Sequence, residues 1–249
     1  TVQLKAASGS GATVTFATTD KGYKIVYLDG VATNTGVFDT GATGLTFKEG
    51  GTNFTNSLLV GTDSTGTLSS AEANTGVGTG VLAALTSGDN NTAVGFSSLL
   101  TNTTGSNNTA VGRCALKLTT TGIINTAMGT LTMCANTTGA CNVAIGSNAL
   151  RTNQTSSFNT AVGMNSLRTN TAQNNTAIGF SALCANTTAA NNTAVGSCAL
   201  TDNTSAANNI AVGFCALHKN TTGADNTSVG TAALSENLTG AGNTAVGRS

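Results

Sequence analysis

The pentapeptide Asn91-Thr92-Ala93-Val94-Gly95 decides how this chain folds, because the sequence returns to it throughout its length. It recurs letter for letter at 108–112, 159–163, 192–196 and 243–247, with looser copies in between. The closing glycines run from Gly61 to Gly247 at intervals of 17 residues, shortened once to 16 between Gly163 and Gly179. A period held this constant indicates a structural repeat.

Two apolar columns define the predicted core. The residue before the glycine is apolar in every copy, and the fourth residue after it is Leu or Met in ten consecutive copies. These columns predict two short core-facing strands in each coil. The predicted core positions are Val94, Val111, Val162 and Val195 in the first column, and Leu99, Leu116, Leu167 and Leu200 in the second.

The length of the repeat selects the fold class. Helix-pair repeats need more than about 30 residues, so 17 residues are too few for them. Two short strands fit one coil of a parallel β-solenoid, or β-roll, with neighbouring coils about 4.8 Å apart. We therefore predict an all-β protein whose residues 56–249 form about twelve coils.

Residues 1–55 lie outside the repeat and contain short β-prone runs. These runs are Val2–Leu4, Ala12–Phe16, Tyr23–Leu28 and Leu45–Phe47. One interpretation is a small β-rich cap or attachment segment, because a stack of coils exposes an apolar end that needs covering. The other is that this segment is the nearest piece of a longer N-terminal region.

A column of asparagines stands four residues before the glycine. Stacked Asn side chains can hydrogen-bond from coil to coil, and Asn tolerates the left-handed backbone of a tight corner. We predict a structural amide ladder; a ligand site is the competing interpretation. The predicted ladder is Asn91, Asn108, Asn125, Asn142, Asn159, Asn175, Asn192, Asn209, Asn226 and Asn243.

Composition and motifs argue against several functions. Ten basic residues balance ten acidic ones, whereas a nucleic-acid-binding protein needs a basic surface. The sequence contains no run of 18 apolar residues, so it predicts no membrane span. His218 is the only histidine, no Cys-x-x-Cys motif occurs and the acidic residues follow no column. We therefore predict no catalytic residue, no cofactor and no metal site, although a carboxylate pair assembled between chains stays open.

The cysteines, glycosylation sequons and threonines each have more than one interpretation. Cys198 and Cys215 share one repeat position in adjacent coils, which suits either small filling side chains or a disulfide. Sequons such as Asn102, Asn136, Asn153 and Asn220 accept glycans in a eukaryotic secreted protein, but they also follow from an Asn/Thr-rich repeat. Most threonines are expected at corners, without the Thr-x-Thr array that an ice-binding face needs.

The repeat unit Asn-Thr-Ala-Val/Ile-Gly-x-x-Ala-Leu-x-x-Asn-Thr-Thr-Gly-x-Asn resembles repeats of phage tail-fibre and fibre-like proteins and of related bacterial surface proteins. It is more distantly similar to the head repeats of trimeric autotransporter adhesins. The resemblance covers 56–249 and implies a homotrimer of left-handed β-rolls that serves as a stiff shaft or adhesive head. Such fibres often carry a self-cleaving C-terminal chaperone domain, which makes Gly247-Arg248-Ser249 a hypothetical cleavage scar.

This resemblance predicts a structural, non-enzymatic component of a virion fibre that contacts the host cell surface or spaces another part toward it. The expected partners are two further copies of the chain, other virion or tail proteins, and a glycan or protein receptor on the host. The alternative is a cellular surface adhesin or extracellular filament, which carries glycans if it is secreted from a eukaryote.

Overall fold

The computed structural model describes residues 2–4, 14–16, 37–38, 47–51, 53–61 and 65–248. The chain divides into two compact units, Thr1–Thr35 and Gly36–Ser249. In the first unit, β1 (Val2–Leu4) pairs antiparallel with β2 (Val14–Phe16). The predicted strand Tyr23–Leu28 lies outside the described residues.

The second unit opens with an antiparallel ribbon. β3 (Val37–Phe38) pairs with β4 (Phe47–Gly51), and β4 pairs with β5 (Phe54–Val60). The short β6 (Ala71–Glu72) then pairs parallel with the beginning of β5. This unit therefore starts ahead of the repeat at Gly36, because β3 and β4 belong to the same sheet as the coils.

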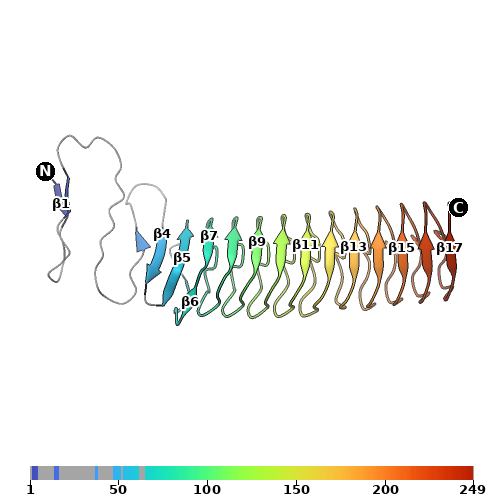
Figure 1. Ribbon diagram of the computed structural model, residues 1–249, viewed down its shortest axis with the longest axis horizontal. Helices are drawn as coiled ribbons and strands as arrows, with labels where there is room; N and C mark the ends of the chain where they lie inside the picture. The colour runs from blue at the N-terminus through green and yellow to red at the C-terminus, as the bar shows by residue number, and fades with distance from the viewer. Residues whose placement is uncertain are drawn as a thin grey trace. The chain divides into compact units, whose positions relative to one another are not determined.

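The rest of the sheet is a stack of three-residue strands that follow one another in chain order (Figure 1). They are β7 (Thr75–Val77), β8 (Thr92–Val94), β9 (Thr109–Val111), β10 (Thr126–Met128), β11 (Val143–Ile145), β12 (Thr160–Val162), β13 (Thr176–Ile178), β14 (Thr193–Val195), β15 (Ile210–Val212), β16 (Thr227–Val229) and β17 (Thr244–Val246). Each strand pairs in parallel and in register with the next. No helix occurs among the described residues, and the predicted all-β parallel solenoid is confirmed.

Each coil contains one strand rather than the predicted two. The segment that carries the leucine column is a run of turns in which Leu99 has a φ of 47° and Ser97 a φ of 55°. This second wall still hydrogen-bonds from coil to coil, for example from Leu99 N–H to the Ala115 carbonyl at 3.1 Å. A left-handed leucine costs about 1–2 kcal/mol, which burial of its side chain, worth about 1.5–3 kcal/mol, offsets.

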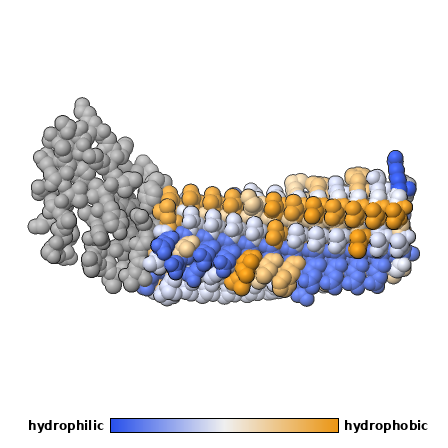
Figure 2. All heavy atoms as spheres, in the orientation of Figure 1, coloured by the Kyte–Doolittle hydropathy of each residue, from blue (hydrophilic) through white to orange (hydrophobic). Residues whose placement is uncertain are grey.

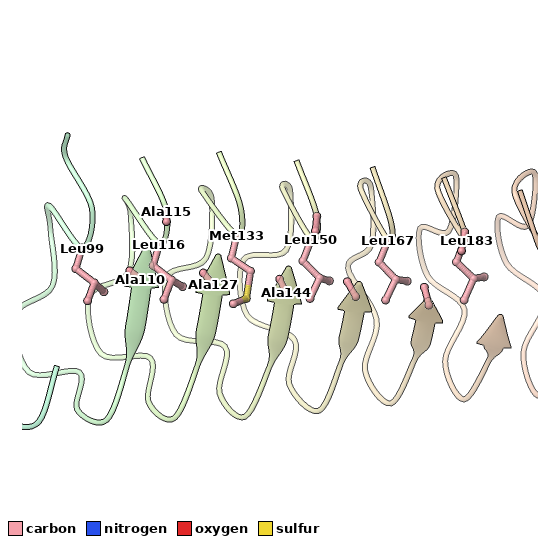
Figure 3. Close-up of a cluster of buried hydrophobic side chains, with 14 of the residues drawn as sticks. Leu99, Ala110, Ala115, Leu116, Ala127, Met133, Ala144, Leu150, Leu167 and Leu183 are labelled. Atoms are coloured by element: carbon pink, nitrogen blue, oxygen red, sulfur yellow. The ribbon is translucent and has the colours of Figure 1, made fainter. Parts of the chain in front are cut away.

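The core consists of alanines from the strand wall and leucines from the turn wall. Ala93, Ala110 and the equivalent alanines as far as Ala211 face inward at 0% exposure, as do Leu99 and Leu116 across from them. Figure 3 shows the two sets of side chains together inside the coils. The same wall keeps the predicted core positions Leu167 and Leu200 fully buried.

The valine column is the main correction to the predicted core. Val94 is 36% exposed, and Val111, Val162 and Val195 are partly exposed instead of buried. The reason is the alternation of side chains along a strand. A three-residue strand whose middle alanine faces the core must turn its first and third residues outward.

The one-residue deletion between Gly163 and Gly179 is absorbed at a corner. The strands on either side, β12 and β13, remain in register with an offset of 16 residues. The side-chain nitrogen of Asn175 then donates to Oδ1 of Asn170 in its own coil at 3.2 Å. One coil later, the side-chain nitrogen of Asn192 is buried and has no hydrogen-bond partner among the described residues.

Candidate functional site

The outer face of the strand wall carries two parallel rows of side chains. The middle residue of each strand faces inward and is alanine except for Gly76 in β7 and Ser228 in β16, so the first and third strand residues point outward. The third-residue row is Val77, Val94, Val111, Met128, Ile145, Val162, Ile178, Val195, Val212, Val229 and Val246. Figure 2 shows it as an unbroken apolar line along the coils. Neighbouring side chains in this row are about 4.8 Å apart, the spacing of paired strands.

The first-residue row is mostly threonine. It runs from Thr75 to Thr244, and only Val143 and Ile210 replace Thr within it. Threonines therefore form an ordered row on the strand face, contrary to the expectation that they gather at corners. The array is Thr-x-Val rather than Thr-x-Thr, and neither row contains a charged residue.

An asparagine ladder runs along one inner corner of the coils, at the ten positions named above. The backbone N–H and the side-chain nitrogen of Asn108 both donate to Oδ1 of Asn91, at 3.0 and 3.2 Å. The same side-chain nitrogen donates to the Gly122 carbonyl at 2.8 Å. Nine of the ten asparagines, Asn91 and Asn108 among them, are buried and join successive coils, and only Asn243 in the last coil is exposed.

A second asparagine ladder, which was not predicted, lies beside the first at the same corner, where Asn91 of the first ladder and Asn102 of the second both donate to the Gly105 carbonyl. The side-chain nitrogen of Asn153 donates to Oδ1 of Asn136 at 3.2 Å and to the Ser156 carbonyl at 2.9 Å. The pattern continues through Asn186, Asn203, Asn220 and Asn237. The signal in the sequence was an asparagine at one fixed position of the Asn-Thr-Thr-Gly corner.

This second ladder also bears on glycosylation. The sequon asparagines Asn102, Asn136, Asn153 and Asn220 belong to it and are 0% exposed. A glycan cannot be accommodated at these sites in the folded coil. Other sequon asparagines lie exposed at the corner before the strand, and they are Asn90, Asn107, Asn174 and Asn191.

The repeat glycines allow the closest backbone contact between coils. Gly146 has a φ of 123°, which side-chain-bearing residues rarely adopt. A Cβ there would lie 2.7 Å from the carbonyl carbon and oxygen of Gly163 in the next coil. The invariant glycine therefore lets the chain turn outward from the strand without a clash.

All six cysteines are unpaired thiols. Burial raises the pKa of the Cys215 thiol, and the adjacent Cys198 raises this pKa further by its charge and a hydrogen bond. The two thiols therefore lie next to each other in successive coils without a disulfide bond. No cluster of three or more His, Cys, Asp or Glu residues occurs in the described part of the chain.

The fold and its two ladders define a β-solenoid repeat protein whose longest regular surface is the Thr-x-Val face. Within the described residues, no helix is long and apolar enough to cross a membrane. Comparison with protein-family models, curated proteins and solved structures finds no match to this chain.

Proposed function

We propose that this protein is a structural and binding component of a virion fibre, either a stiff shaft or an adhesive head that acts at the host cell surface. The uninterrupted stack of in-register coils supports a mechanical, non-enzymatic role. Backbone ladders, two asparagine ladders and a continuous core connect each coil to its neighbours, so bending requires many bonds to open together. The resemblance of the repeats to phage fibres supports the virion setting.

The observation that carries the proposal is the exposed apolar row on the strand face. A row of valines, isoleucines and one methionine runs from Val77 to Val246 without interruption by a polar residue. Single exposed apolar residues are ordinary, but a continuous apolar line of this length marks an interaction surface. In the proposed fibre, the rows of three chains pack together and form the homotrimer.

The mass of the purified full chain in solution tests this assembly. Light scattering with reductant should give about three times the chain mass of 24.4 kDa. A stable monomer would contradict the trimeric fibre. An open-ended series of masses would favour the extracellular filament that is the alternative function.

A cellular adhesin or extracellular filament is the second candidate, and the exposed sequons favour it. Asn107 and Asn174 lie at accessible corners where a glycan fits, in contrast to the buried sequons of the second ladder. Mass spectrometry of peptides containing these two residues, from protein made in its natural host, separates the candidates. Glycan mass there supports the secreted adhesin, and its absence supports the virion fibre.

The Thr-x-Val face also identifies ice as a ligand to be tested. An uncharged, regularly spaced array is the kind of surface that can order water, but a trimer packed through this face would bury it. Thermal hysteresis in a dilute solution of the protein would therefore count against the trimeric fibre. Freezing behaviour equal to that of buffer would exclude ice binding.

A further inference from the structure

The middle of the solenoid has a charge pattern that the balanced overall composition conceals. Between residues 90 and 201 the chain contains four charged side chains, and all of them are positive: Arg113, Lys117, Arg151 and Arg168. The acidic residues that flank this stretch are Asp89 on one side and Asp202 on the other. The central coils therefore carry uncompensated positive charge.

Three of these cations occupy the same repeat position in nearby coils. Lys117, Arg151 and Arg168 each directly follow a core residue of the turn wall, Leu116, Leu150 and Leu167. The carbonyls of Lys117, Arg151 and Arg168 each accept a hydrogen bond from the preceding coil, at 3.1 Å in all three cases. This backbone ladder holds the three residues in one line, which we call the basic stripe.

The basic stripe lies on the wall opposite the Thr-x-Val face. The leucines before its residues point into the core toward the strand alanines (Figure 3). Arg151 and Arg168 are exposed, and Lys117 is partly exposed. The stripe therefore stays open to solvent when chains pack through the strand face.

Cys134 occupies the stripe position in the coil between Lys117 and Arg151. Burial raises the pKa of this thiol, and the neighbouring Cys114 raises it further. Lys117, Arg151 and Arg113 act in the opposite direction, since positive charges near a thiol stabilise the thiolate. Three cations thus lie within electrostatic range of a single side chain.

A cation elsewhere in the solenoid shows the usual arrangement. Lys219 donates to Glu236 in the next coil at 2.7 Å. Within the described residues, no such ion pair is formed by Lys117, Arg151 or Arg168. Each side chain of the basic stripe is therefore available to an anion in solution.

We propose that the basic stripe binds an acidic polysaccharide along the axis of the solenoid. Cations in a straight line, one or two coils apart, match a linear polymer with regularly spaced sulfate or carboxylate groups. The repeat position of the stripe holds no Phe, Tyr or Trp on which the bases of a single strand could stack, and its one imidazole, His218, lies coils away from the three cations. The three cations of the stripe are also too few for the broad basic surface of a duplex-binding protein.

The proposed function includes a glycan receptor on the host, and this proposal names the chemical class of that glycan. Its biological meaning therefore rests on the proposed function. The binding itself is a property of one chain. Failure of the trimer would be seen in the mass of the protein, and failure of the stripe would be seen in polysaccharide binding.

Affinity measurements with heparin, alginate and neutral dextran test the proposal on the full chain. Heparin supplies sulfates, alginate supplies carboxylates, and dextran shares the sugar backbone without charge. The wild-type protein should bind heparin or alginate, with an affinity that falls as salt rises, and should not bind dextran. Preference between the two acidic polymers identifies the anion.

The test variant is the double substitution Arg151→Gln and Arg168→Gln, and the matched control is Lys219→Gln. Both exchange cations for amides on exposed positions, but Lys219 is already paired with Glu236. The double variant should lower affinity at least tenfold and reduce the slope of log K against log salt by roughly 1.5–2, since two counterion-releasing contacts are lost. The control should bind like the wild type, and equal circular dichroism spectra should show that all three proteins fold alike.

Three results would overturn the proposal. The first is no retention of the wild type on either acidic polymer at low salt. The second is equal binding by the double variant and the wild type. The third is variant-sensitive binding to duplex DNA without binding to either polysaccharide, which would assign the stripe to nucleic acid instead.

Discussion

Ala161 and Val162 are neighbours in β12, yet their side chains lie on opposite sides of the same wall. Ala161 is fully buried in the core, and Val162 is partly exposed on the outer face. The smaller side chain therefore faces inward, where the wall of the next turn comes close, and the larger one faces solvent. This arrangement separates residues that hold the coil together from residues that, in the proposed fibre, hold chains together.

Substitution at Val162 should therefore act on assembly more than on folding. Val162→Asp should change the stability of the isolated chain by about 1 kcal/mol or less, as for an exposed strand position. It should reduce the mass seen by light scattering toward 24.4 kDa, because three carboxylates would meet at the interface. Circular dichroism should still show the strands.

Two controls make this result specific. Gln154→Asp adds the same charge at an exposed corner and should leave the mass of the assembly unchanged. Ala161→Asp buries a carboxylate and should destabilise the chain by more than about 4 kcal/mol. If Val162→Asp failed to fold and any folded fraction still assembled, the valine column would have to be assigned to the core.

The repeat glycine should tolerate no side chain. Gly146→Ala should destabilise the chain by about 2 kcal/mol or more, because it combines a strained φ of 123° with a Cβ 2.7 Å from the Gly163 backbone. The matched control is Gly242→Ala, where φ is 69° and no atom lies within 4 Å of the new Cβ. This control pays the left-handed strain alone, about 1 kcal/mol. Equal melting temperatures of the two variants would show that close contact between coils is unimportant.

The repeat period was sufficient to predict the solenoid, the inward leucines and one asparagine corner. It could not show which strand residue faces inward. Valine is the more hydrophobic neighbour, but exposed apolar residues are common, and the close approach of two walls selects alanine. The left-handed backbone of the leucines could not be predicted either, since a single sequence does not reveal a φ near 50°. The basic stripe became visible only when the wall that presents Lys117, Arg151 and Arg168 was known.

Breaking the first asparagine ladder should weaken the coil strongly. The side-chain nitrogen of Asn142 donates to Oδ1 of Asn125 and to the Ser156 carbonyl, and its Oδ1 accepts from the backbone N–H of Asn159. Asn142→Ala leaves these buried groups without partners and should cost about 2–4 kcal/mol in unfolding free energy. Denaturant titration measures this loss.

An asparagine outside the ladders serves as the control for that experiment. Asn107 is exposed and has a φ of 60°, a conformation that glycine adopts without strain. Asn107→Gly should therefore change stability by less than about 1 kcal/mol. A similar loss in both variants would mean that the ladder contributes no more to stability than an exposed corner asparagine does.

The pKa of Cys134 should report the positive charges around it. Burial raises the pKa of this thiol above its ordinary value of 9.0, while Lys117, Arg151 and Arg113 stabilise the thiolate and lower it. Alkylation of Cys134, followed peptide by peptide in a mass spectrometer, should reach its half-maximal rate at higher pH in the folded chain than in the denatured chain.

Removal of one cation should raise the pH of half-maximal Cys134 alkylation further. Lys117→Gln takes away a charge that favours the thiolate, so the pKa rises and alkylation at a fixed alkaline pH becomes slower. Lys219→Gln removes a cation that is absent from the surroundings of Cys134 and should leave its alkylation unchanged. An unchanged or lower half-maximal pH in Lys117→Gln would place Lys117 outside electrostatic range of the thiol. The line of exposed cations in the basic stripe would remain.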